Sequence, residues 1–317
     1  MRLNGRAAKL CRAMRDDADR LRIAVQEGAG HPQVIDCGVH SVGGLEAGLR
    51  LAEACLAGLG NVRLLTSDAP LWQGPSVAVT TDHPVAACLA SQYAGWEVSG
   101  DGYFSMGSGP MRAAAGREPL FDTIGHREST DVAVGILEAD RLPPETVCRE
   151  LAAACNVDPD QLTLLVAPTT SIAGTVQVVA RSIETALHKL HELGFDLRCV
   201  ESGFGVAPLP PVAGDTITGI GRTNDAIIYG AEVTLYVRGD DASLRETGVK
   251  VPSNTSADYG QPFRLIFERY DGNFYDIDPM LFSPAVITLV NLRTGHSFRF
   301  GHTLPRVVHE SFGVEVG

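Results

Sequence analysis

An arginine and a glutamate stand three residues apart, at Arg181 and Glu184, in a segment whose apolar residues recur at three- and four-residue steps. That period predicts a helix over residues 171–193, on whose surface the two side chains are neighbours. A carboxylate beside a guanidinium stays ionised and can take a proton from water, which is general acid–base chemistry. The same spacing also fits a solvated helix face that carries an ordinary ion pair.

The predicted helix is preceded by a turn of hydroxyl and small side chains that includes Thr170 and Ser171. Such a turn suits an anion or a ring placed against exposed backbone N–H groups. His188 and His191 continue the polar side of the helix. No third metal ligand follows them at a recognisable spacing, so we predict no metal site.

Three other segments are rich in small polar residues. They contain Ser91, Gln92 and Tyr93 ahead of Gly95, Ser108 within residues 106–110, and Arg222 and Asn224 within residues 221–225. The second could form a backbone nest or only a turn, and the third is typical of a turn before a strand. The chain has no nucleophile elbow, no phosphate-binding loop and no dinucleotide fingerprint.

Helical and strand-like patterns alternate along the chain. They predict strands at 34–39, 62–65, 77–81, 131–138, 162–167, 226–237 and 286–292, and helices at 45–59, 84–92, 143–155, 171–193 and 256–270. This mixture predicts an α/β (α+β-like) protein with helices packed on mixed sheets. The glycine-rich residues 95–109 and the proline-rich residues 207–214 are the candidate crossings between two lobes.

Length and charge exclude several classes of protein. The chain has 317 residues, which corresponds to about two domains. Its formal charge of −12 argues against nucleic-acid binding, which needs a basic surface. No apolar run approaches the roughly 20 residues that span a membrane, and no leader pattern is present, so we expect a cytoplasmic protein. The seven cysteines are scattered without a Cys-x-x-Cys pair, as is typical of small buried hydrophobes.

Together these blocks resemble a known family, methenyltetrahydromethanopterin cyclohydrolase. The resemblance rests on six segments: 35–44, 88–96, 106–110, 166–190, 221–226 and 258–263. It extends from about residue 34 to residue 313, whereas the arginine-rich N-terminal segment carries no such signal. Met111 departs from the pattern, because the family more often has alanine there.

The resemblance implies a two-domain subunit with its active site in a cleft between the domains, assembled as a homotrimer. We place the domains at residues 1–98 plus 241–317, and at 99–240 with the catalytic helix. The implied reaction is reversible hydrolysis of the methenyl bridge of a reduced pterin to the formyl pterin, in one-carbon metabolism and formaldehyde oxidation, without a metal or redox cofactor. The family's catalytic arginine and glutamate correspond to Arg181 and Glu184.

In this hypothesis Glu184 is the general base toward water, and Arg181 keeps it ionised. The predicted substrate-binding residues are Ser91, Gln92, Tyr93, Ser108, Thr170, Ser171, Lys189, Arg222 and Asn224. Among them, Gln92, Tyr93 and Asn224 are expected on the pterin and Arg222 or Lys189 on its anionic tail. Two alternatives stay open: a nicotinamide-dependent pterin oxidoreductase, and a non-catalytic pterin-binding protein.

Overall fold

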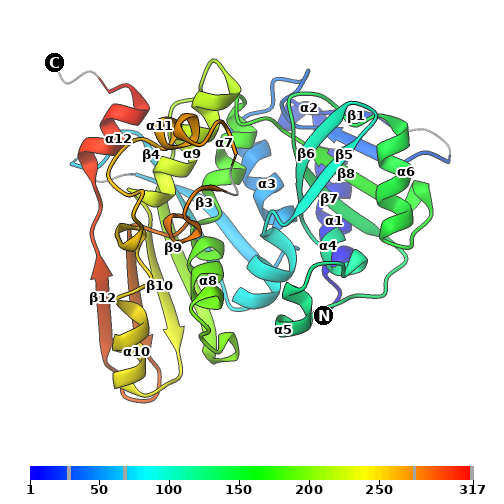
Figure 1. The fold of residues 1–317 in the computed structure, drawn as a ribbon. Helices are drawn as coiled ribbons and strands as arrows, with labels where there is room; N and C mark the ends of the chain where they lie inside the picture. The colour runs from blue at the N-terminus through cyan, green and yellow to red at the C-terminus, as the bar shows by residue number, and fades with distance from the viewer. Residues whose placement is uncertain (27–29, 67–69, 274–275, 315–317) are drawn as a thin grey trace. The chain divides into compact units, whose positions relative to one another are not determined.

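Two six-stranded mixed sheets covered by helices make up the computed structural model (Figure 1). The structure describes residues 1–26, 30–66, 70–273 and 276–314. The chain divides into two compact units: the first contains Met1–Asn61 and Ala86–Val178, and the second contains Val62–Val85 and Val179–Gly317. The predicted α/β class is confirmed.

The first sheet has the strand order β1-β2-β8-β7-β6-β5. Its strands are β1 (Ala24–Gln26), β2 (Gln33–Asp36), β5 (Trp96–Gly100), β6 (Tyr103–Ser108), β7 (Ala133–Glu138) and β8 (Leu162–Val166). The central strands β2, β8 and β7 are parallel, whereas β1, β6 and β5 pair antiparallel with their neighbours. Nearly every residue of β7 and β8 is buried, which is typical of strands covered on both faces.

Alternate residues of these strands belong to two separate apolar cores. Ile136 and Leu165 pack in one core, and the adjacent Leu137 and Leu164 pack in the other. The helices of this unit are α1 (Leu3–Asp16), α2 (Ala18–Leu21), α3 (Leu45–Cys55), the π-helix η1 (Val85–Gln92), α4 (Met111–Ala115), α5 (Leu120–Ile124), α6 (Glu145–Ala154), η2 (Pro159–Gln161) and α7 (Ile172–Val179). Residues of α1 and α3 line the first core, and those of α6 line the second.

The second sheet has the order β12-β11-β10-β9-β4-β3. Its strands are β3 (Gly60–Thr66), β4 (Pro75–Thr81), β9 (Val200–Pro208), β10 (Glu232–Val237), β11 (Val286–Asn291) and β12 (Ser297–Gly301). Its helices are α8 (Ser182–Glu192), η3 (Leu197–Cys199), α9 (Thr216–Ile228), α10 (Asp241–Gly248), η4 (Ser253–Thr255), α11 (Phe263–Arg269), η6 (Pro279–Leu281) and α12 (Pro305–Phe312). Helix α8 packs against β9 and β10, and α11 and α12 pack against α9.

The boundaries of the two units differ from those of the predicted domains, which were residues 1–98 plus 241–317 and residues 99–240. Residues 62–85 join the second sheet because β4 pairs antiparallel with β9. Neither predicted crossing joins the lobes. Residues 95–109 form the β5–β6 hairpin of the first sheet, and residues 207–214 lie within the second unit. Strand pairing between distant segments decides this division, and no local composition reports it.

Three predicted elements are wrong in part. The helix over 171–193 is interrupted, because α7 ends at Val179 and α8 begins at Ser182. Residues 226–228 are the last turn of α9 rather than the start of a strand, since a short apolar run fits either structure. The helix predicted over 256–270 begins only at Phe263, after Pro262, because a proline restrains the residue before it to extended backbone.

Candidate active site

Arg181 and Glu184 lie at the start of α8, directly after the interruption. The chain passes from the first unit to the second between Val178 and Val179, so α7 and α8 pack in different units. Arg181 occupies the N-cap position of α8, with φ −89° and ψ 8°, and makes no side-chain cap hydrogen bond. Serine, threonine, aspartate and asparagine are preferred there because they accept a bond from the first turn, which a guanidinium cannot do. Helix capping therefore does not explain this arginine.

Glu184 lies in the first turn of α8 and is 4% exposed, and Arg181 is 7% exposed. Both are therefore buried, and the alternative of a solvated face with a surface ion pair is wrong for this pair. The N-terminal end of a helix carries partial positive charge, which favours an ionised carboxylate in the first turn. The arrangement provides a carboxylate withdrawn from bulk water that can act as a general base.

Two glycines of β9 allow the first turn of α8 to approach the second sheet closely (Figure 1). A Cβ atom on Gly205 would lie 2.4 Å from Oγ of Ser182, and one on Gly203 would lie 3.0 Å from Cγ2 of Ile183. A larger residue at either position would require the side chains of Ser182 or Ile183, in the turn that carries Glu184, to shift. The sequence analysis missed these glycines, although alternate glycines in a strand indicate close approach of another element.

In the first unit, the predicted residues Ser91 and Gln92 are the last two residues of the π-helix η1, and Tyr93 follows them. Ser91 is fully buried, and its Oγ donates to the carbonyl oxygen of Cys55 at 2.6 Å. Ser108 is also buried, with its Oγ 3.4 Å from Sγ of Cys55. Oγ of Ser108 also donates to the carbonyl oxygen of Ile136 at 3.5 Å, so both serines contact backbone oxygens. The half-buried Tyr93 is the more accessible group of this segment.

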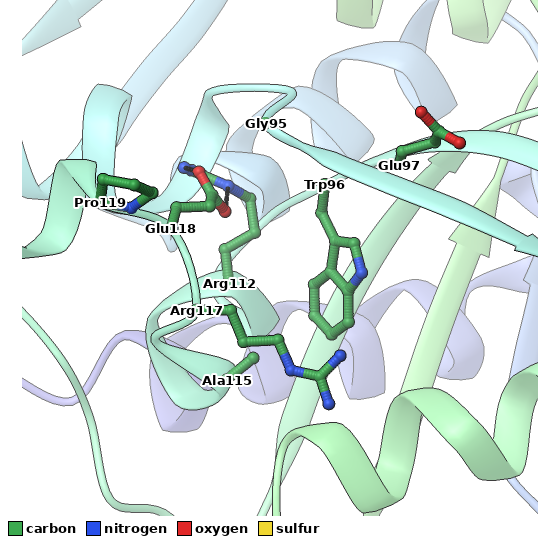
Figure 2. Close-up of a pocket in the computed structure, with 8 residues that line it drawn as sticks. All are labelled: Gly95, Trp96, Glu97, Arg112, Ala115, Arg117, Glu118 and Pro119. Atoms are coloured by element: carbon green, nitrogen blue, oxygen red, sulfur yellow. Dashed lines mark hydrogen bonds and ion pairs between the residues drawn. The ribbon is translucent and has the colours of Figure 1, made fainter.

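A cavity of about 260 Å³ lies next to this segment (Figure 2). Its lining includes Trp96, Arg112, Arg117 and Glu118, none of which was predicted as a site residue. The guanidinium of Arg117 lies 5.5 Å from the centre of the Trp96 ring, and Figure 2 shows the two side chains next to each other. The sequence signal for this cavity was the indole of Trp96 beside Gly95. Arg112 and Arg117 come from a segment whose sequence shows no recognisable pattern.

Ser171 closes the turn between β8 and α7. Its Oγ accepts a hydrogen bond from the backbone N–H of Gly174 at 3.0 Å and donates to the carbonyl oxygen of Pro168 at 2.8 Å, so it acts as a helix cap. Thr170 beside it is half-buried. The loop after the neighbouring strand β2 approaches this turn, since a Cβ on Gly38 would lie 2.4 Å from Oγ of Ser171.

Asp36 organises that neighbouring loop. Its carboxylate accepts backbone N–H bonds from the four residues Gly38, Val39, His40 and Ser41, at 2.7–2.9 Å. Burial acts to raise the pKa of Asp36, but these four hydrogen bonds hold it below its usual value. The acid is therefore a structural anion that fixes the loop at the carboxyl end of β2.

In the second unit, the side-chain N–H groups of the predicted binding residues donate to backbone carbonyl oxygens. Nζ of the buried Lys189 donates to the carbonyl oxygen of Met280 at 2.6 Å, and burial lowers its pKa to about 8. Nε of Arg222 donates to the carbonyl oxygen of Ser311 at 3.0 Å. Nδ2 of Asn224 bonds back within α9 at 2.9 Å. Their contacts with substrate stay predictions.

No group of three or more His, Cys, Asp or Glu side chains that could hold a metal ion occurs among the described residues. Within the same residues, no helix is long and apolar enough to cross a membrane. Six of the cysteines are buried and Cys199 is partly buried, in agreement with the sequence analysis.

Comparison with known proteins covers nearly the whole chain. The model of the family described as Cyclohydrolase (MCH) matches residues 2–312, so the match includes the N-terminal segment in which the sequence analysis found no signal. A methenyltetrahydromethanopterin cyclohydrolase of Rhodopirellula baltica is 53% identical over 287 residues, covering 89% of this chain and 86% of the relative. Proteins of that name from Methylobacillus flagellatus and Methanosarcina barkeri are 45% and 42% identical, over 94% and 98% of this chain and 91% and 98% of theirs. The chain therefore belongs to the methenyltetrahydromethanopterin cyclohydrolase family.

Proposed function

We propose that this protein catalyses the reversible hydrolysis of the methenyl bridge of methenyl-tetrahydromethanopterin to the formyl pterin. The names of its relatives and their coverage of the chain support this activity. The structural observation that carries the proposal is the buried Glu184 in the first turn of α8, next to the N-cap residue Arg181.

In the proposed mechanism Glu184 takes a proton from a water molecule while the water oxygen attacks the bridge carbon. That carbon belongs to a cationic amidinium and is already electrophilic, so the step needs no metal to polarise it. The C–N bond to one nitrogen then breaks, and Glu184 returns its proton to that nitrogen. The remaining hydroxyl proton leaves as the formyl C=O forms, so each hydrolysis releases one proton.

Arg181 has a separate role in this proposal. Burial raises the free energy of an ionised carboxylate, and a guanidinium three residues away opposes that effect. Gln92 and Tyr93 are proposed to contact the pterin. The homotrimer and a place in formaldehyde oxidation are proposed from the family resemblance alone, and the cytoplasmic location is proposed from the sequence. Light scattering of the purified protein tests the trimer.

Loss of the amidinium absorbance of methenyl-tetrahydromethanopterin measures the activity directly. Glu184→Gln should lower kcat by about 10²–10⁴-fold, the usual contribution of a general base, while substrate binding is retained. Glu192→Gln is the matched control, because Glu192 lies on the same helix but is exposed. Wild-type protein without activity would refute the proposed reaction, and near-normal turnover by Glu184→Gln would refute the assigned base.

A further inference from the structure

The π-helix η1 ends at Gln92, one of the two residues proposed to contact the pterin. Its hydrogen bonds join residues five apart, as in the bond from the backbone N–H of Tyr93 to the carbonyl oxygen of Cys88 at 2.7 Å. π-Helical turns are rare and occur frequently at functional sites. The last carbonyl groups of any helix lack partners within it, so this end needs donors from elsewhere.

Arg112 supplies donors from α4, and the backbone N–H of Gly109 also donates to the carbonyl oxygen of Ser91, at 2.8 Å. Its Nη1 donates to the carbonyl oxygens of Leu89 at 2.8 Å and Ser91 at 3.3 Å. The side chain is fully buried, and its charge is balanced by Glu118, which accepts from Nε at 2.8 Å and also pairs with Nη2. The guanidinium thus contacts the carbonyl groups one and three residues before Gln92.

The same guanidinium also contacts the residue after Gln92. Its central carbon lies 5.0 Å from the centre of the Tyr93 ring, a favourable cation–π distance. Gly95 lets the chain turn around this group, because a Cβ there would lie 2.3 Å from Oε2 of Glu118 and 2.6 Å from the Tyr93 ring. Figure 2 shows Arg112 and Glu118 together beneath the Gly95 turn. Arg112 therefore contacts both chain neighbours of Gln92, which are Ser91 and Tyr93.

The charge pair by itself adds little net stability, whereas the guanidinium also donates to the carbonyl oxygens of Leu89 and Ser91. The cost of desolvating two charges often equals their attraction, and apolar residues of similar size are often as stabilising. We propose that Arg112 is a positioning residue that, paired with Glu118, fixes Gln92 and Tyr93 in the conformation that binds the pterin. This inference rests on the proposed function and deepens it.

The test separates binding from folding with a double variant. Arg112→Met alone would leave the Glu118 carboxylate half-buried and unpaired, so Arg112→Met is combined with Glu118→Met. KM and kcat for methenyl-tetrahydromethanopterin are measured together with Tm. We expect KM to rise about tenfold or more because positioning is lost, while kcat at saturation stays within about threefold. Arg112→Lys, which keeps the charge but not the forked geometry, should also raise KM.

Met14→Ala is the control for lowered stability, because Met14 is buried in the first apolar core and is not among the contacts of Arg112. It should lower Tm and leave KM unchanged. If the double variant folds with the KM of wild type, or if Met14→Ala raises KM equally, the positioning role is refuted while the proposed reaction stands. If wild-type protein has no activity on the methenyl pterin, the proposed function fails and the inference fails with it.

Discussion

Replacing Asp225 by asparagine should make the stability of the protein less sensitive to pH. Asp225 is fully buried on α9, and its Oδ1 accepts a hydrogen bond from the backbone N–H of Phe263 at 2.8 Å. Burial raises the pKa of Asp225 from 3.8 to about 7, and the negative charge of Glu310 adds to the rise. The acid of the motif in residues 221–225 is therefore a buried link between α9 and α11.

The sign of the effect follows from proton binding. The unfolded chain releases this proton near pH 3.8, whereas the folded protein keeps it to about pH 7. Between these values the folded state binds more protons, so the free energy of unfolding falls as the pH rises. At about 1.4 kcal/mol per pH unit, this group lowers it by about 3 kcal/mol between pH 5 and pH 8.

Urea unfolding of both proteins at the two pH values provides the assay. Asparagine keeps an oxygen for the Phe263 N–H and does not titrate. The free energy of unfolding of the variant, relative to that of wild type, should therefore rise by about 3 kcal/mol from pH 5 to pH 8. Asp215→Asn, at the N-cap of the same helix, is the control. Hydrogen bonds from Thr218 hold the pKa of Asp215 below its usual value, so its difference from wild type should not change over this range. A constant difference for Asp225→Asn as well would refute the buried titration.

Three further variants test the positioning of the site. Gly205→Ala should lower kcat about tenfold with a smaller change in KM, because its Cβ would lie 2.4 Å from Oγ of Ser182 and displace the first turn of α8; unchanged steady-state kinetics would contradict this. Lys189→Met should lower the unfolding free energy by about 1–3 kcal/mol by removing the donor to the Met280 carbonyl, and a large rise in KM would instead support the tail contact predicted from the sequence. Asp36→Asn should also cost about 1–3 kcal/mol at pH 7 in urea unfolding, since one acceptor of its four N–H bonds becomes a donor. The loss should shrink as the pH falls through the lowered pKa of Asp36 and the wild-type carboxylate itself becomes protonated.

Local patterns predicted buried strands such as residues 162–167 correctly, since short continuous apolar runs are typical of strands covered on both faces. The spacing of Arg181 and Glu184 left a solvated ion pair open, and the family resemblance selected them as the predicted catalytic pair. The interruption between α7 and α8 could not be predicted in this way. Regularly spaced apolar residues indicate that one helix face is buried, but they do not indicate in which core it is buried. Here the period continues across a boundary between units, from Val178 to Val179.

The binding residues were harder to predict for a related reason. Residue type identified Ser91 and Ser108 as polar groups, but a hydroxyl that bonds a buried backbone oxygen has the same sequence signature as one that faces a ligand. Arg112 was missed because its partners lie at Leu89, Ser91 and Glu118, and only the folded backbone brings these together.

The chain departs from local rules at three places in the described residues. An arginine occupies the N-cap of α8, eight residues adopt a π-helix rather than an α-helix, and a buried arginine–glutamate pair stands where apolar packing would serve stability equally well. Natural sequences depart from such rules mainly at functional sites. The first departure places Glu184 and Arg181, and the other two place Gln92 and Tyr93. Both groups therefore belong in the same test, in which changes at Glu184 should affect kcat and changes at Arg112 should affect KM.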